Sequence, residues 1–242
     1  MHHTREQAAF TRRELIAFIG VTTVLLMLFL APAVDRTKPR SDAMSCMLNL
    51  KQIGLASMLW ANDHIDRFPE AVSISNGGWN EFFRRGDASS YLWTNYVAMG
   101  DLMGKSPSFL ICPSDERMPA TNFDALANTN ISYFTGDVSS DASPRSILGG
   151  DRNLGPGTTP ASDYGFSPAD GKGSNVTVRG PVCWTLKMHS GKSMTRGNVL
   201  LVDGSAQMTT SGNLYNNWVK TALAATATNT APSPHAIRLI FP

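Results

Sequence analysis

Charged side chains are scarce in this chain of 242 residues, and their signs nearly cancel, with 21 basic against 19 acidic residues. Such a balance gives no electrostatic basis for binding nucleic acid, so we expect no nucleic-acid partner. The sequence also lacks an internal repeat of about 20–50 residues, which excludes solenoid and propeller architectures. Glycine, serine, threonine, asparagine and proline are plentiful instead. That composition favours short strands and many turns over a helical bundle.

Cysteine is also scarce. The three cysteines are Cys46, Cys112 and Cys183, and no two of them have the C-x-x-C spacing that is typical of a zinc site. We therefore expect no zinc site and no other cofactor. In an oxidising compartment, one pair could form a disulfide and leave the third cysteine over.

The motifs of common hydrolases are missing as well. Asp203, Ser205 and His189 have the residue types of a catalytic triad, but the chain contains no G-x-S-x-G, and Ser205 follows a turn glycine. No histidine has the i, i+4 partner of a helical metal site. We expect His189 to lie in a loop or at a strand edge, bonded to the backbone. The sequence therefore predicts a protein without enzymatic activity.

Oxygen ligands suitable for calcium occur around one glycine pair. Asp151 and Asn153 follow Gly149 and Gly150, and Asp163 lies further along the chain. Their spacing is not that of an EF-hand loop, and Asp and Asn beside glycine usually form turns. We expect no metal here and keep calcium as the alternative. Arg152, between the first two, should pair with a nearby carboxylate.

Long hydrophobic runs are absent except at the N-terminus, where residues 15–34 carry no charge. As a helix, this run would be about 30 Å long, roughly the hydrocarbon thickness of a bilayer. Arg5, Arg12 and Arg13 precede it and favour a cytoplasmic N-terminus. The run predicts a single-pass helix in the inner (cytoplasmic) membrane, with the following domain in the periplasm.

Three interpretations of this segment stay open. It could be a plain signal anchor that displays an envelope or adhesive module without polymerising. It could be an export signal, because TRREL resembles a twin-arginine signal and residues 31–33 have the small-x-small form cut by signal peptidase. A soluble exported binding protein would then be released after Ala33. The third interpretation is a type IV prepilin, which the segment resembles: a short polar leader ends at Ala9, Phe10 becomes the first mature residue, and Glu14 the fifth.

Residues 41–64 predict a further helix, with Ser41 as its N-cap. At 100° per residue this helix has two apolar faces where an ordinary surface helix has one. Either it is a central buried helix, or it is shared between its own domain and neighbouring subunits. One face carries Met44, Met47, Leu48, Leu55, Met58 and Leu59, and the other carries Cys46, Leu50, Ile53 and Trp60.

Residues 46–69 resemble the segment that follows the N-terminal helix in the type II secretion pseudopilin family, in the form found in planctomycete and verrucomicrobial bacteria. Further similarity lies in FLICPSD (109–115), GGDRNL (149–154), GNVLLVDGSAQ (197–207) and IRLIFP (237–242). The resemblance implies a pilin-like α+β fold, with a long N-terminal helix, part membrane and part amphipathic, packed on a small antiparallel β-sheet head. Its parts would be a leader (1–9), a membrane or filament-core helix (10–34), an amphipathic helix (35–64) and a head (65–242).

The resemblance also implies a function. Prepilin peptidase would cut between Ala9 and Phe10, and Phe10 would be N-methylated. The subunit would polymerise, with itself or with other pilin-like subunits, into a filament of a type II secretion or type IV pilus-like system, and a filament at the cell surface is the alternative to one within the envelope. Glu14 would pair with the N-terminal amine of an adjacent subunit. Alternatively, Glu14 is only a helix-start anion that interacts favourably with the helix dipole.

Two implications concern the head. The resemblance favours a disulfide between Cys46 and Cys112, which would tie the helix to the head, although Cys183 could replace either partner. Some pseudopilins bind calcium in this domain, which is a second reason to keep Asp151, Asn153 and Asp163 as an alternative metal site.

Local patterns give the expected elements of the head. The clearest is a β-hairpin over residues 197–207, because the Asp203–Gly204 pair tolerates the backbone of a tight turn. Other expected elements are helices over 91–103 and 213–227, strands over 108–112, 131–134, 146–150 and 182–188, a long surface loop over 154–180, and a short extended segment at the end of the chain.

Overall fold

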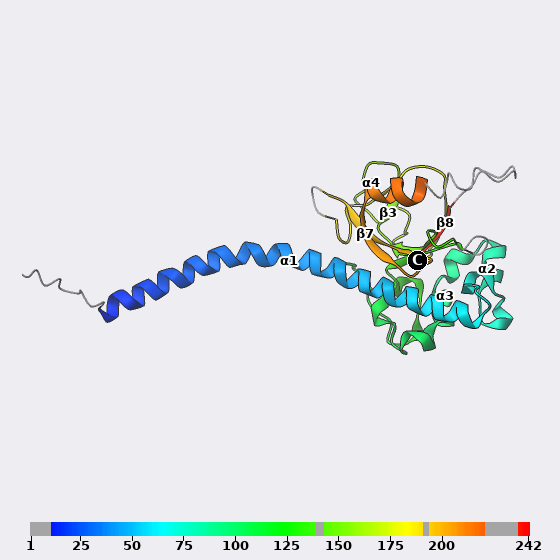
Figure 1. Ribbon diagram of the computed structural model, residues 1–242, viewed down its shortest axis with the longest axis horizontal. Helices are drawn as coiled ribbons and strands as arrows, with labels where there is room; N and C mark the ends of the chain where they lie inside the picture. The colour runs from blue at the N-terminus through cyan, green and yellow to red at the C-terminus, as the bar shows by residue number, and fades with distance from the viewer. Residues whose placement is uncertain (1–10, 139–142, 191–193, 221–236) are drawn as a thin grey trace, which may run out of the picture. The chain divides into compact units, whose positions relative to one another are not determined.

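The computed structural model describes residues 11–138, 143–190, 194–220 and 237–242 (Figure 1), and within these ranges the side chains of residues 28–40, 83 and 84 are not described. The expected leader, with Ala9 and Phe10, lies outside the described residues, as do the side chains of residues 31–33 and the expected helix beyond residue 220. The chain divides into two compact units, Met1–Ser41 and Asp42–Pro242.

The longest element is the helix α1 (Arg12–Asp63), which extends through the boundary between the two units. We expected Ser41 to be the N-cap of a separate helix, but it lies inside α1. In the part of the chain that the structure describes, no helix is both long and apolar enough to cross a membrane.

The second unit is built on a six-stranded antiparallel sheet in the order β4-β8-β1-β2-β6-β7. A separate two-stranded sheet pairs β3 with β5. The strands are β1 (Tyr133–Gly136), β2 (Ile147–Asp151), β3 (Leu154–Pro156), β4 (Ser174–Val178), β5 (Val182–Trp184), β6 (Arg196–Leu201), β7 (Ala206–Thr210) and β8 (Ile237–Phe241).

Short helical elements connect and cover these strands. The α-helices after α1 are α2 (Asn80–Arg85), α3 (Trp93–Ala98) and α4 (Ser211–Leu214), and α4 continues as the π-helical turn η8 (Tyr215–Val219). The 3-10 turns are η1 (Pro69–Ala71), η2 (Ile74–Asn76), η3 (Ala88–Tyr91), η4 (Gly100–Met103), η5 (Pro107–Leu110), η6 (Phe123–Ala125) and η7 (Asn128–Asn130).

Both faces of the six-stranded sheet are buried, because alternate residues of its central strands belong to two different hydrophobic clusters. Figure 1 shows α3 and the C-terminal part of α1 on one side of the sheet and α4 on the other. The cluster toward α1 takes Tyr133, Leu148, Leu200 and Ile240, while the cluster toward α4 takes Phe134, Ile147, Val199, Leu201, Leu239 and Phe241.

The pilin-like fold class expected from the sequence is wrong. The sheet is not a small one under a single helix: it has six antiparallel strands, a second sheet accompanies it, and both of its faces are covered. The membrane part of the expected helix is not supported either, since no described helix meets the length and hydropathy that spanning requires.

Some of the expected individual elements are confirmed and others are wrong. The hairpin over 197–207 is confirmed by β6 and β7, and the final extended segment by β8. The expected strand over 108–112 is wrong, because residues 107–110 form the 3-10 turn η5. The expected loop over 154–180 is also wrong, since it contains both β3 and β4.

Candidate functional site

Residues 42–63 of α1 have one buried and one exposed apolar face. Cys46, Leu50, Ile53 and Trp60 are at most 5% exposed and form part of the core toward the sheet. On the opposite face, Met44, Leu48, Leu55, Met58 and Leu59 are 43–60% exposed. Of the two interpretations of the double stripe, a helix buried all round is wrong. One stripe closes the head, and most of the other stripe remains about half exposed.

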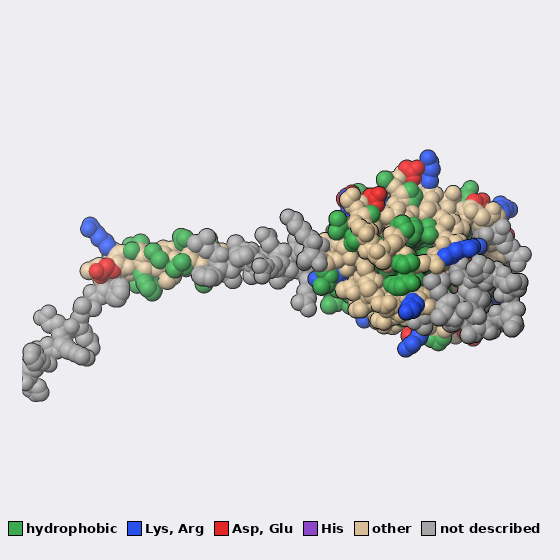
Figure 2. Space-filling model, turned by 90° about the horizontal axis from the view of Figure 1, so that it is seen from above, with side chains coloured by type: hydrophobic (Ala, Val, Ile, Leu, Met, Phe, Trp, Pro, Cys, Tyr) green, Lys and Arg blue, Asp and Glu red, His purple; other side chains and the backbone are tan. Residues whose placement is uncertain are grey.

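Exposed hydrophobic side chains continue toward the N-terminus of the same helix. Figure 2 shows them along the described N-terminal part of α1, with charged side chains at its start. They are Leu15, Ile16, Phe18, Ile19, Val21, Val24, Leu25, Leu26 and Met27, each about half or more exposed. An apolar surface of this kind usually marks contact with protein or membrane.

Glu14 lies in the first turn of α1 and is bonded within its own chain. One of its carboxylate oxygens accepts hydrogen bonds from the backbone N–H of Thr11 at 2.9 Å and from the Thr11 hydroxyl at 2.8 Å. The Glu14 N–H donates to the same hydroxyl at 3.4 Å. This reciprocal arrangement is a capping box, and its backbone bond, followed by the side-chain bond, lowers the pKa of Glu14.

The disulfide of the structure joins Cys46 to Cys112, the pair that the family resemblance implied, and Cys183 remains a buried free cysteine. The bond ties α1 to the segment that follows η5. Cys112 Sγ also lies 3.3 Å from His189 Nε2, and that nitrogen lies 3.3 Å from Asp151 Oδ2. His189 lies in a turn between β5 and β6, so the expected loop position is confirmed, but its buried side chain contacts Cys112 and Asp151 and not the backbone.

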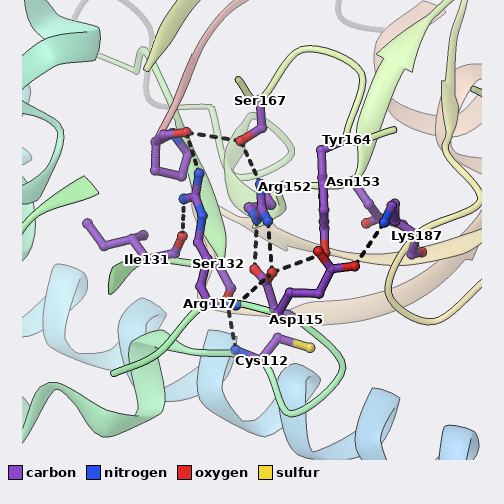
Figure 3. Close-up of polar contacts among 12 residues, drawn as sticks. Cys112, Asp115, Arg117, Ile131, Ser132, Arg152, Asn153, Tyr164, Ser167 and Lys187 are labelled. Carbon is purple, nitrogen blue, oxygen red and sulfur yellow. Dashed lines mark hydrogen bonds and ion pairs between the residues drawn. The ribbon is translucent and has the colours of Figure 1, made fainter. Parts of the chain in front are cut away.

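A second polar cluster lies beside the disulfide, centred on the buried ion pair of Asp115 and Arg152 (Figure 3). Arg152 donates to both carboxylate oxygens, from Nε at 2.7 Å and from NH2 at 2.8 Å. The Tyr164 hydroxyl donates to Asp115 Oδ1 at 3.1 Å, and the guanidinium of Arg152 lies 3.4 Å from the centre of the Tyr164 ring. Arg152 therefore pairs with a carboxylate, as expected, although the partner comes from a distant part of the sequence.

Burial and charge act in opposite directions on this pair. Burial alone would raise the pKa of Asp115, but the hydrogen bonds and charge of Arg152 hold it below its usual value. Nearby, burial and then the charge of Arg152 lower the pKa of Arg117 to about 10. Asp115 and Arg152 thus form a compensated pair of buried charges, and removing one partner alone would be costly.

Arg117 acts as a clamp between backbone segments. Its NH1 donates to the carbonyls of Asn128 and Ile131, and its NH2 donates to those of Pro168 and Pro242. Both terminal nitrogens are thus used by the protein itself. This geometry fixes the segment after β8 against the loop that precedes β4.

The cluster forms the floor of an open cleft of about 590 Å³. Arg152 and Tyr164 line it together with Glu116, Asp163 and Lys187. Lys187 Nζ is 2.8 Å from Glu116 Oε1 at the rim. Because its arginines are engaged by carboxylate and carbonyl oxygens, the cleft offers little free charge to a ligand, and the cluster holds segments of the head together.

The proposed calcium ligands share no hydrogen-bond partner. Asp151 Oδ2 accepts from the N–H and the Nδ2 of Asn198, at 2.6 and 3.0 Å. Asn153 instead donates to the carbonyls of Lys187 and Arg196. Asp163 is exposed, and its Oδ1 accepts from the Gly165 N–H, which is the turn role that we expected.

The residue types of a triad also lie in separate environments. Asp203 and Ser205 are in the β6–β7 turn, where Asp203 Oδ1 accepts from the Ser205 N–H at 2.9 Å. His189 contacts Asp151 and Cys112 instead. Sequence reasoning missed Asp115, Arg117 and Tyr164, since buried polar residues brought together by the fold leave no periodic signal. It missed the capping box although T-x-x-E before an apolar run was a readable signal.

Comparisons with protein-family models, with curated proteins and with solved structures found no match for this chain.

Proposed function

We propose that this protein is a non-enzymatic structural subunit that polymerises, in the manner of the pilin-like subunits of type II secretion or type IV pilus-like systems. Its task would be mechanical: the addition of subunits would extend a fibre or piston. The partners would be further copies of this chain or other pilin-like subunits. No cofactor is required for such a role.

The exposed apolar face of α1 carries this proposal. One stripe of residues 42–63 is fully used by the head, yet five large side chains on the other stripe remain in water. Burying each of these half-exposed side chains would contribute on the order of 1 kcal/mol. We assign this face to a second copy of the chain, because residues 15–27 of the first unit also expose hydrophobic side chains, so that each of the two units has an apolar surface of its own to offer to another subunit.

The proposal includes a location and a processing step. Before assembly the chain would be held at the inner membrane with its head in the periplasm, and a disulfide in the head is consistent with that oxidising compartment. Prepilin peptidase would cut before Phe10 and leave Thr11 as the second mature residue. The capping box of Thr11 and Glu14 would then lie at the very start of the mature chain.

Glu14 has two roles in this proposal, which compete for one carboxylate. In the isolated chain the carboxylate accepts from Thr11. In the polymer it would accept the charged N-terminal amine of a neighbouring subunit. The cap pairs the carboxylate with neutral Thr11 donors, whereas the neighbour's amine would carry a positive charge, and this added ion-pair attraction would let the amine displace the cap.

Reversing the polarity of the exposed face tests the proposal. We expect the double variant Leu48→Lys with Leu55→Lys to abolish cross-linkable assemblies in envelope fractions, because both side chains are more than half exposed and contribute to no core cluster. Leu102→Lys is the matched control, since Leu102 is an exposed leucine on η4. Assembly of the double variant at the level of the control would contradict the proposal.

The mature N-terminus separates the proposal from its two rivals. A mass and N-terminal sequence that begin at methylated Phe10 would support a polymerising subunit. A start at Val34 would identify a soluble exported binding protein, and an intact Met1 would identify a non-polymerising anchored module. Glu14→Ala should in addition remove assembly while leaving membrane association unchanged.

A further inference from the structure

Four potential metal ligands from four parts of the chain meet in the interior of the head. Cys46 comes from α1, Cys112 follows η5, Asp151 ends β2, and His189 follows β5. None is more than 6% exposed. The ligand atoms of the two cysteines and His189 all lie within 4.8 Å of one another, and Asp151 Oδ2 is 3.3 Å from His189 Nε2.

Contacts within the protein do not fully satisfy this group. Asp151 Oδ1 and His189 Nδ1 are buried, and neither has a hydrogen-bond partner among the described residues. A buried polar atom without a partner costs about 1–3 kcal/mol, so such atoms usually have an explanation. A cation next to Asp151 would supply one, because it would neutralise a carboxylate that no buried arginine or lysine reaches through a described ion pair.

We propose that reduction of the Cys46–Cys112 disulfide creates a site for one zinc ion, with the two thiolates, His189 Nε2 and the Asp151 carboxylate as ligands. Sulfur, imidazole and carboxylate donors are those that Zn²⁺ takes in four-coordinate sites. Zinc bonds of about 2.0–2.3 Å in a tetrahedron place neighbouring ligand atoms roughly 3.3–3.8 Å apart. Two of the six ligand pairs, His189 Nε2 with Cys112 Sγ and with Asp151 Oδ2, already have such a separation of 3.3 Å. The sulfurs, bonded to each other in the disulfide, would separate on reduction, and the Asp151 carboxylate would move toward them, since it lies outside the group formed by the two cysteines and His189.

The two forms are mutually exclusive and chemically balanced. A dithiol reductant breaks the S–S bond, supplies two electrons and two protons, and itself becomes a disulfide. Zinc then displaces the protons of both thiols to solvent and binds the thiolates. Oxidation requires loss of the metal, because a disulfide sulfur carries no charge with which to hold it.

Zinc and the disulfide would close the same loop. Cys46 and Cys112 are 66 residues apart, and either link fastens α1 to the segment after η5. The head would thus have one cross-link for reducing conditions and another for oxidising conditions. The sequence had argued against zinc because no C-x-x-C is present, but spacing along the chain says nothing about cysteines that the fold brings together.

Metal retention by the full-length chain tests the proposal. The protein is reduced with a phosphine, incubated with Zn²⁺ or Co²⁺, and desalted. We expect the reduced protein to retain one zinc ion per chain, the oxidised protein to retain none, and cobalt to show thiolate charge-transfer absorption. His189→Gln should lose stoichiometric retention. The matched controls, His64→Gln and Cys183→Ser, should keep it.

Three results would overturn the site: no retention by the reduced protein, undiminished retention by His189→Gln, or loss of retention in Cys183→Ser. A measurement without variants guards against misfolding of His189→Gln. Zinc should protect Cys46 and Cys112 of the reduced wild-type protein from alkylation, as read by peptide mass. Equal alkylation with and without zinc would also overturn the proposal.

Discussion

Glu70 is a carboxyl group placed where a charge is poorly tolerated. It lies in η1, is 1% exposed, and its Oε1 has no hydrogen-bond partner among the described residues. Burial raises the pKa of Glu70 to about 8, and the negative charge of Asp137 acts in the same direction. At neutral pH the folded protein therefore holds a proton on Glu70 that the unfolded chain has released.

This proton makes stability depend on pH. Between pH ~4.5 and ~8 the folded state binds more protons than the unfolded state, so the free energy of unfolding should fall as pH rises through that window. Glu70→Gln should remove this slope, and its advantage over the wild-type protein should reach a few kcal/mol at pH 8. Urea unfolding of both proteins at pH 5 and pH 8 measures how the free energy of unfolding changes with pH. Glu116→Gln, at an exposed glutamate, is the control. Equal slopes in wild type and Glu70→Gln would contradict the assignment.

What could be read from the sequence at this scale depended on distance along the chain. The capping box of Thr11 and Glu14 involves residues three apart and was in principle readable. The partner of Arg152 was not, because Asp115 lies 37 residues away and reaches it only through the fold. For the same reason, the sequence did not indicate that Cys112, His189 and Asp151 are neighbours, although it had indicated each of them separately as a candidate residue.

At the scale of elements, the β6–β7 hairpin is the clearest product of local chemistry. Two hydrogen bonds close the turn. The Gly204 N–H donates to the Leu201 carbonyl, and the Ser205 N–H donates to the Asp203 carboxylate. Gly204 has φ of +79°, while Asp203 is not among the residues with positive φ. This is a three-residue loop whose last position is left-handed, a different turn from the two-residue one expected.

A β-carbon at Gly204 should therefore destabilise the hairpin. We expect Gly204→Ala to cost about 1–2 kcal/mol, because the left-handed backbone is strained for alanine. The new carbon would also lie 2.6 Å from Met58 Sδ, which would have to move. Gly212→Ala is the control: Gly212 lies in α4 with no atom within 4 Å of an added carbon, and alanine favours a helix. Thermal unfolding of both variants should separate them, and equal melting temperatures would refute the strain.

Other elements could not be predicted, because their partners are remote. β4 pairs with β8, about 60 residues later, and β3 pairs with β5, although β4 lies between these two strands in the sequence. Their glycine-, serine- and aspartate-rich neighbourhood has the composition of a loop, so tertiary pairing decided their conformation. Conversely, the apolar residues before Cys112 looked like a strand but form η5, which begins at Pro107, where proline suits the first turn.

At the scale of the whole molecule, the Cys46–Cys112 disulfide is the largest single constraint on the head. Closing a loop of 66 residues lowers the conformational entropy of the unfolded chain, which in the chain-entropy description raises the free energy of unfolding by about 4 kcal/mol. The double variant Cys46→Ser with Cys112→Ser should lose roughly that much stability in an oxidising buffer containing a chelator. Cys183→Ala should lose about 1 kcal/mol, since it removes only a buried sulfur. Urea unfolding compares them, and a double variant as stable as Cys183→Ala would show that the disulfide contributes little.

The position of β8 in the sheet has a consequence for the order of events in folding. β8 follows the other described strands in the sequence, yet it lies between β4 and β1 in the sheet. Until residues 237–241 arrive, β4 has no neighbour and one edge of β1 stays open. During synthesis, the sheet is therefore completed only after these residues have been added, and a chain that stalls before them leaves unpaired the edges of β4 and β1 that β8 would cover, where chaperones and proteases can bind.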